Sequence, residues 1–249
     1  MNNMYRKPAA YATKLMCAAM LLFATTACTD FDNYEEPKET VSGVVIDKNT
    51  QKPLETEVGE GGLRIKMMEY SWSDSPTPYY FGGMQDGTFN NTRIFKGNYG
   101  ITVFGAFVPM EEQRHDVKGT LNLSYEVEPF LNIDWAGEPV VNGDGTITAR
   151  FNINRGTSNA QCQQELSDVR LFIVHGAPYV GENNKDDRFS VYLSGDEAKA
   201  MLGQSASITS RGQLVSGRPY HVRIGARIDK EVEGSRRYNY SSIKTIQIP

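Results

Sequence analysis

An apolar residue at every second position is the pattern that most limits what the chain after Glu39 can fold into. In an extended strand, this alternation puts apolar side chains on one face of a sheet and polar side chains on the other. The alternating series are Leu63, Ile65 and Met67; Tyr99, Ile101 and Val103; Leu121, Leu123, Tyr125 and Val127; Ile147, Ala149, Phe151 and Ile153; Phe189, Val191 and Leu193; and Tyr220, Val222, Ile224, Ala226 and Ile228. The body of the chain is therefore predicted to be all-β.

Turn-forming residues separate the alternating segments, which predicts short strands joined by tight connections. Such turns are expected at residues 47–49, 86–87, 97–98 and 144–145. Short strands with regular turns favour antiparallel β-sandwiches. One short helix is expected after Ser194, whose hydroxyl can accept the amide of Glu197 in a capping box, with Gly203 as its end.

A turn-rich break at residues 135–139 divides the body into two predicted sandwiches in tandem, residues 39–134 and residues 139–249. Residues 28–138 contain 9 basic and 19 acidic side chains, a net charge of −10, whereas residues 139–249 contain 14 and 11, a net charge of +3. Two bodies of opposite sign can dock on each other or present different faces to partners.

The first 27 residues have the features of a targeting signal. Arg6, Lys7 and Lys14 precede an apolar stretch at residues 15–24 that is too short to span a bilayer. The small residues before Cys28 resemble the lipobox of bacterial lipoproteins, in which the cysteine thiolate takes a diacylglycerol thioether before the signal peptide is cleaved. The alternative is an ordinary secretory signal that is cleaved near Ala27.

Residues 28–38 are predicted to be a flexible tether, because this acidic stretch cannot bury enough apolar surface to fold. Acidic residues just after a lipidated cysteine resemble the surface-export signal of Bacteroidetes lipoproteins. The resemblance implies a protein anchored by lipid in the outer membrane and facing the cell exterior. A merely solvated tether is the other interpretation.

Composition and cysteine content exclude several classes of protein. The net charge of −4 argues against a nucleic-acid-binding protein, which would show a basic face. Cys17 lies within the predicted signal and Cys28 would be acylated, so only Cys162 would remain as a free thiol. A single thiol cannot form an internal disulfide or a structural zinc cluster.

Two groups of motifs resemble known domain families. Residues 41–47 (VSGVVID), Thr50 and residues 52–54 (KPL) resemble prealbumin-like domains of the carboxypeptidase-regulatory type, as do the hairpin residues 86–99. Residues 214–226 (LVSGRPYHVRIGA) resemble the end of a fibronectin type III or related immunoglobulin-like module. In that family the tyrosine at the position of Tyr220 forms a tyrosine corner, in which its hydroxyl bonds to nearby backbone.

The signal, the domain order and residues 237–241 (RYNYS) together resemble a Bacteroidetes lipoprotein family of unknown function. Its members tend to be encoded beside starch-utilisation-type receptors and their glycan-binding lipoprotein partners. The resemblance implies an accessory role in polysaccharide utilisation and implies no catalytic residues.

Catalytic and cofactor motifs are not found in the sequence. It contains no G-x-S-x-G, H-E-x-x-H, Walker or dinucleotide-binding pattern. The carboxylate pairs at residues 111–112 and 186–187 are adjacent, whereas a glycosidase holds two carboxyl groups across a cleft. The polar run at residues 182–187 has oxygen ligands without the spacing of a calcium loop. We expect no enzyme activity, no cofactor and no metal site.

Aromatic side chains gather in one segment that also contains prolines and small polar residues. Tyr70, Trp72, Tyr79 and Tyr80 are candidate glycan-binding residues, because sugar rings stack their C–H faces on flat aromatic rings. The alternative is that Tyr70 and Phe81 pack inward while Trp72 covers the sandwich edge. A second set, Trp135, Tyr238 and Tyr240, is expected to pack at the domain junction.

Three interpretations of the function remain open. The first is a non-enzymatic module that binds polysaccharide, oligosaccharide or a glycan-binding partner near an uptake receptor. The second is a structural spacer that docks on neighbouring outer-membrane proteins through edge strands or charged faces. A hydrolase is the third and weakest interpretation.

Overall fold

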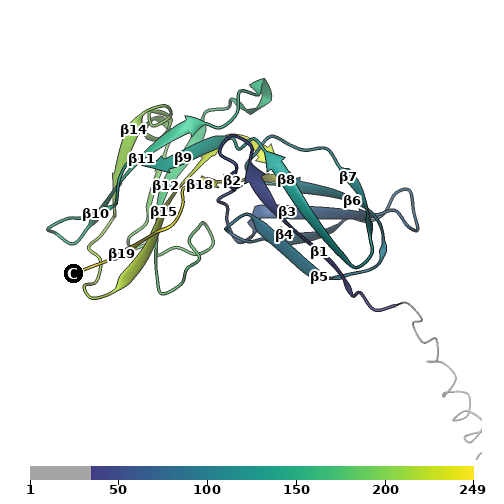
Figure 1. The fold of residues 1–249 in the computed structure, drawn as a ribbon. Coiled ribbons are helices and arrows are strands. Elements are labelled where there is room, and N and C mark those ends of the chain that lie inside the picture. Colours follow the sequence, from purple (N-terminus) through teal and green to yellow (C-terminus); the bar gives the residue numbers. More distant parts are fainter. Residues whose placement is uncertain (1–34) are drawn as a thin grey trace, which may run out of the picture. The chain divides into compact units, whose positions relative to one another are not determined.

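Two groups of β-strands follow one another in the computed structural model, which describes residues 35–249 (Figure 1). Strands β1 to β8, within residues 39–127, enclose one hydrophobic core, and strands β9 to β19, within residues 131–247, enclose another. The sheets are antiparallel except for one strand pair, and the only α-helix of the described residues is short. The predicted all-β class is confirmed. The resemblances to the two named domain families stay predictions.

The first sandwich consists of two sheets. In one sheet, β1 pairs with β2 and β5 antiparallel and with β8 parallel; the other has the order β4-β3-β6-β7. The bounds are β1 (Glu39–Asp47), β2 (Lys52–Pro53), β3 (Gly59–Glu69), β4 (Tyr79–Gly83), β5 (Thr88–Ile94), β6 (Gly97–Phe104), β7 (Gln113–Val117) and β8 (Thr120–Val127). The parallel β1–β8 pair departs from the purely antiparallel arrangement that the sequence predicts.

Gly43 shows why the motif at residues 41–47 needs its glycine. A Cβ at this position would lie 2.4 Å from the carbonyl oxygen of Leu123 and 2.5 Å from a ring carbon of Phe89. These distances are too short for any real side chain, so a residue with a Cβ would force β8 or the Phe89 ring away. The glycine therefore lets β8 lie beside β1 while Phe89 stays in the core.

The second sandwich packs a four-stranded sheet on a five-stranded sheet. In the first, β11 pairs with β14 on one edge and with β9 and β10 on the other; in the second, the order is β13-β12-β15, followed by β18 and β19. The bounds are β9 (Leu131–Trp135), β10 (Val140–Val141), β11 (Ile147–Arg155), β12 (Leu166–His175), β13 (Val191–Ser194), β14 (Ser205–Thr209), β15 (Pro219–Ile228), β16 (Glu231–Val232), β17 (Ser235–Arg236), β18 (Asn239–Tyr240) and β19 (Lys244–Gln247), with a 3₁₀-helix η1 (Ala160–Cys162).

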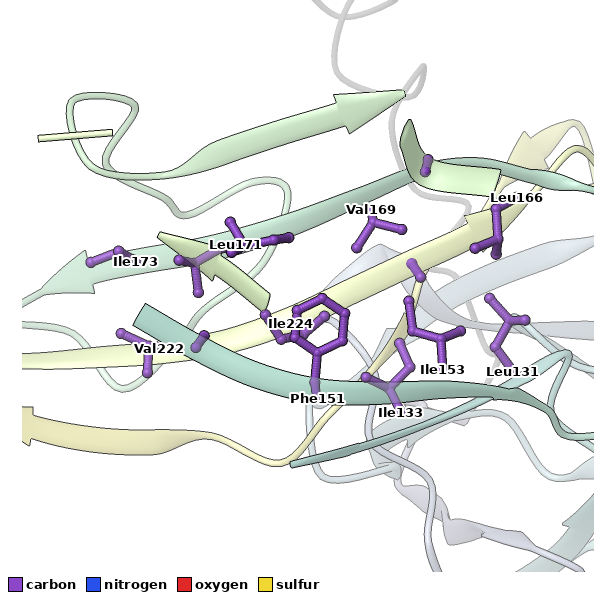
Figure 2. Packing of buried hydrophobic residues seen from close by; sticks show 14 of the residues in the cluster. Leu131, Ile133, Phe151, Ile153, Leu166, Val169, Leu171, Ile173, Val222 and Ile224 are labelled. Atoms are coloured by element: carbon purple, nitrogen blue, oxygen red, sulfur yellow. The ribbon is translucent and has the colours of Figure 1, made fainter. Parts of the chain in front are cut away.

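The core of the second sandwich lies between these two sheets. Figure 2 shows Phe151 and Ile153 of β11 facing residues of β12 and β15, among them Leu171 and Ile224. The alternating residues that the sequence assigns to one face of β11 and β15 are the ones that are buried here. Cys162 is completely buried in the same core, and burial raises the pKa of its thiol.

Strand β12 is buried on both faces, and the sequence analysis did not identify it. Leu171 and Ile173 face the main core, whereas Phe172 and Val174 belong to a separate buried cluster with Tyr240. A strand covered on both sides has no reason to alternate apolar and polar residues. The period-two pattern is therefore absent from residues 171–174.

Strand β9 places the domain boundary earlier than predicted. The sequence analysis assigned residues 131–134 to the first sandwich, but Leu131 and Ile133 pair with β11 and lie in the second core. The first sandwich ends with β8, so the boundary lies between Val127 and Leu131. The turn at residues 135–139 connects two strands of one sheet.

The short helix α2 (Asp196–Lys199) is present, but the capping box predicted at Ser194 is wrong. Gly195 is the N-cap residue, with φ 63°, and no side chain caps the helix. Glycine adopts a positive φ more readily than other residues. The turn into the helix therefore lies at Gly195, and the helix begins after this residue and not after Ser194. No helix within residues 35–249 has the length and hydropathy needed to cross a membrane.

Tyr125 of β8 gives a test of the first core. Its hydroxyl is buried and has no hydrogen-bond partner among residues 35–249, and burial raises its pKa to about 12. An unfolded tyrosine ionises near pH 10, so above that pH the unfolded state holds fewer protons than the folded state, and stability falls as the pH rises.

We expect Tyr125→Phe to stabilise the protein by about 1 kcal/mol at neutral pH, because it removes an unsatisfied buried hydroxyl. The loss of stability between about pH 10 and pH 12 should also become shallower. Urea unfolding at pH 7 and at alkaline pH measures both effects. Tyr192→Phe, at a half-exposed ring, is the control; equal behaviour of the two variants would contradict this account.

Candidate functional site

Trp72 is the most exposed large hydrophobic residue of the described chain. It lies in the loop between β3 and β4, and 78% of its surface is accessible to solvent. Its indole Nε1 donates a hydrogen bond to Glu69 Oε1 at 3.0 Å, which ties the ring to the end of β3. One interpretation of the sequence expected Trp72 to cover the sandwich edge. The exposure of its side chain shows that it does not.

Tyr79 is the second exposed ring of the four candidates. It begins β4, and 49% of its surface is accessible. Its hydroxyl accepts a hydrogen bond from Asn91 Nδ2 at 2.8 Å, and its ring centroid lies 6.2 Å from that of Phe81. Phe81 packs against the first core, as expected, so the Tyr79 ring continues that core to the surface.

Tyr70 and Tyr80 are engaged by arginine side chains. The Arg114 guanidinium lies 3.2 Å from the ring centre of Tyr70, and the Arg64 guanidinium lies 3.8 Å from that of Tyr80. The Tyr80 hydroxyl donates to Glu233 Oε1 at 2.7 Å, and this hydrogen bond raises its pKa. Trp72 and Tyr79 are therefore exposed to solvent. An arginine covers one face of each of the other two candidate rings, those of Tyr70 and Tyr80.

Two further predicted residues have different outcomes. Tyr220 is buried, and its hydroxyl accepts the backbone amide of Val215 at 3.1 Å, which is the type of contact expected of a tyrosine corner. The predicted lipidation site, Cys28, lies outside the described residues, as do the signal peptide and most of the tether.

Arg223 is the centre of the junction between the two sandwiches. This β15 side chain is completely buried, and its Nη1 donates to the carbonyl oxygens of Thr56 at 2.8 Å and Val180 at 3.0 Å. Its Nε donates to Ser241, and its Nη2 lies 3.6 Å from Glu55 Oε2. Burial lowers the pKa of Arg223 to about 10, although Tyr240 and Glu55 oppose the shift.

Glu57 is the acidic counterpart from the first sandwich. Its carboxylate accepts the Tyr240 hydroxyl at 2.9 Å and the backbone amide of Asn183 at 2.7 Å. Arg237 of the second sandwich donates to the carbonyl oxygens of Glu60 and Gly62. The acidic first sandwich and the basic second sandwich therefore dock on each other, one of the two outcomes that their charges allowed.

Asn239 joins the sandwiches through neutral hydrogen bonds. Its Oδ1 accepts the backbone amide of Leu131 at 3.1 Å, and its Nδ2 donates to the carbonyl oxygen of Ala106 at 2.8 Å. Tyr240 lies at the junction, as the sequence analysis expected, and the Trp135 indole donates to the carbonyl oxygen of Ser242 at 2.8 Å.

A cleft of about 520 Å³ opens beside this junction. It is lined by Asp47, Thr50, Lys52, Pro53, Leu54, Glu55, Asp86, Thr88, Pro129, Leu131, Asn132, Ile133, Asp134, Trp135, Asn239, Tyr240 and Ser242. These residues come from four separate segments of the chain. Only the tertiary fold brings these segments together, so no local sequence pattern indicates the cleft.

The remaining polar candidates are used within the fold. Glu182 pairs with Arg170 at 2.7 Å, and Asp186 pairs with Arg188 at 2.6 Å, so the run at residues 182–187 is engaged by cations. Between residues 35 and 249, no three His, Cys, Asp or Glu side chains are grouped so that they could hold a metal ion.

Arg223→Met tests whether the buried arginine holds the junction. The variant leaves the carbonyl groups of Thr56, Val180 and Ser241 without the Arg223 donor, so we expect it to destabilise the protein by about 3–5 kcal/mol in urea unfolding. The control is Lys244→Met, which removes a surface ion pair with Glu138 and should cost about 1 kcal/mol or less. Equal losses for the two variants would show that the junction does not depend on Arg223.

Comparison with known proteins gives consistent matches. Residues 39–128 match the model of the N-terminal domain of a protein of unknown function, DUF3823. A crystal structure of a DUF3823 family protein from Bacteroides uniformis has 32% sequence identity and a TM-score of 0.78, and the match covers 86% of this chain and 100% of the other.

Two more distant structures share the fold. A proposed carbohydrate-binding protein from Bacteroides uniformis has 22% identity and a TM-score of 0.70, with 85% of this chain and 100% of the other covered. A DUF3823 family protein from Parabacteroides merdae has 19% identity and a TM-score of 0.65, with 86% and 100% covered. No curated protein matches the chain. The identity to the first structure, along its full length, shows that this chain belongs to the DUF3823 family.

Proposed function

We propose that this protein is a non-enzymatic, carbohydrate-binding accessory of an outer-membrane polysaccharide-utilisation system. The observation that carries the proposal is the exposure of Trp72. A tryptophan that is 78% accessible buries little of its apolar surface, so burial contributes little stability at this position. Its flat ring offers the C–H face of a sugar a surface on which to stack.

The surroundings of Trp72 suit such a contact. The loop contains Ser71, Ser73 and Asp74, whose polar groups can bond to sugar hydroxyls, and two prolines that reduce the entropy lost on binding. The bond from the indole nitrogen to Glu69 further limits the motion of the ring. Tyr79 offers a second exposed ring at the end of the same loop.

The more distant of the two Bacteroides uniformis proteins supports carbohydrate as the class of ligand. The protein with 22% identity is itself a proposed carbohydrate-binding protein and has the same fold over 85% of this chain. Because the identity is low, it supports a ligand class and not a particular sugar.

The cellular setting belongs to the proposal as well. Acylation of Cys28 would anchor the protein in the outer membrane, and the acidic tether at residues 29–36 would hold its sandwiches outside the cell. The partners would be a starch-utilisation-type receptor and the glycan-binding lipoprotein that accompanies it.

A structural spacer is the second candidate, and the polar junction favours it. Arg223, Glu57 and Asn239 fix one sandwich on the other through buried hydrogen bonds. A rigid pair of sandwiches can hold a partner at a set distance from the membrane. This role does not require Trp72.

Trp72→Ala tests the binding proposal. We expect isothermal titration of residues 29–249 to detect binding to at least one of maltoheptaose, cellohexaose, xylohexaose and mannohexaose, and the variant to weaken it by about tenfold or more. Tyr192→Ala removes an exposed ring of the second sandwich, 46% of whose surface is accessible, and should leave the affinity unchanged. Binding that Trp72→Ala does not alter would remove this ring from the proposal, and no binding to any of the four probes would favour the spacer.

Cys28→Ser tests the anchor. In cells of the source bacterium, the unaltered chain should incorporate labelled palmitate and sediment with outer membranes. The variant should lose the label and leave the membrane fraction, because the sandwiches have no other hydrophobic anchor in this proposal. Equal membrane association of both chains would contradict lipid anchoring at Cys28.

A further inference from the structure

The cleft beside the junction has the size and position of a small-molecule site. Its volume of about 520 Å³ lies within the range of about 300–1,000 Å³ that such sites occupy. Sites of this kind occur preferentially where two domains meet. Its walls come from both sandwiches, with Lys52 and Asp86 on one side and residues 131–135 on the other.

One wall of the cleft is the edge strand β9. The Leu131 amide already bonds to Asn239 Oδ1, and the indole nitrogen of Trp135 already bonds to the Ser242 carbonyl. Trp135 is partly buried against the second core, so it can offer a ligand the uncovered part of its ring but no hydrogen bond. A fixed aromatic ring beside polar groups is the arrangement on which a sugar ring can stack.

Three polar side chains on the same walls have no partner among the residues that the structure describes. The side chains of Lys52, Asn132 and Asp134 form no hydrogen bond or ion pair with any of residues 35–249. Together they supply an ammonium donor, an amide that donates and accepts, and a carboxylate that accepts. Adjacent hydroxyl groups of a sugar donate and accept in the same combination.

The inner end of the cleft is held rigid by the junction. Glu55 and Tyr240 line it, and the Arg223 guanidinium lies 3.6 Å from Glu55 Oε2 and 4.0 Å from the Tyr240 ring centre. A ligand would thus meet groups whose positions are already fixed, which lowers the entropy that binding costs.

Charge restricts which ligands the cleft can accept. Four carboxylates line it, from Asp47, Glu55, Asp86 and Asp134, against the single ammonium of Lys52. Asp47 is used internally, because it accepts the Asn49 amide and the Thr50 hydroxyl, but its charge remains. An anionic ligand placed here would be repelled by the negative excess.

We propose that this cleft binds an uncharged sugar unit of a glycan and rejects uronic acids. The inference rests on the proposed carbohydrate-binding function and names a second site, separate from Trp72, together with its ligand class. Trp135 supplies the stacking surface, and Asn132, Asp134 and Lys52 bond to the hydroxyl groups.

Asp134→Ala and Asn132→Ala test this site without disturbing the fold, since neither side chain has an internal partner to lose. With the neutral oligosaccharide that binds best among maltoheptaose, cellohexaose, xylohexaose and mannohexaose, we expect each variant to weaken binding about tenfold. Asp187→Ala, at an exposed aspartate without a side-chain partner in the described chain, should change nothing. Hexagalacturonate should not bind in the cleft, so any binding of this probe should be the same in Asp134→Ala as in the unaltered protein.

The outcomes separate this inference from the proposed function. If none of the neutral probes binds, the proposed function and this inference both fail. If binding is lost in Trp72→Ala but unchanged in Asp134→Ala and Asn132→Ala, only the cleft is excluded. Binding of hexagalacturonate that depends on Asp134 would overturn the charge selection.

Discussion

Burial of one charged side chain, Arg223, sets the arrangement of the rest of the molecule. A guanidinium without water is stable only where hydrogen-bond acceptors surround it. Its acceptors come from Thr56 of the first sandwich and from Val180 and Ser241 of the second. The two sandwiches must therefore meet in one geometry, and the cleft beside them has a fixed shape. The junction stabilises the fold, and the cleft proposed as a binding site lies beside it.

The alternation of apolar residues was sufficient to predict the strands that have one buried face and one solvent-exposed face. Residues 63–67, 99–103, 147–153 and 220–228 all lie in strands whose apolar members are buried. The same rule did not identify β12, because both of its faces are covered. It also assigned β9 to the wrong sandwich, because pairing partners are not encoded in a local pattern.

Prediction of the candidate site was partial for a related reason. Trp72 and Tyr79 could be identified as candidates because aromatic, proline and serine residues cluster there in the sequence. Arg223 could not, since its place in the alternation of β15 assigns it to the polar face, which is normally solvated. The cleft residues Lys52, Asp86 and Asp134 are dispersed along the chain, and only the docking of the sandwiches brings them together.

The outer face of β12 has a consequence for how such a chain can change over generations. Phe172 and Val174 are covered by residues 238–240, which in turn bond to Glu57 of the other sandwich. Replacement of the first sandwich by an unrelated one would leave the Arg223 guanidinium without the Thr56 carbonyl and the Tyr240 hydroxyl without the Glu57 carboxylate. Replacement of the second would leave Glu57 without that donor. Exchange of a single sandwich therefore costs buried hydrogen bonds, and we expect the two halves to be inherited as a pair.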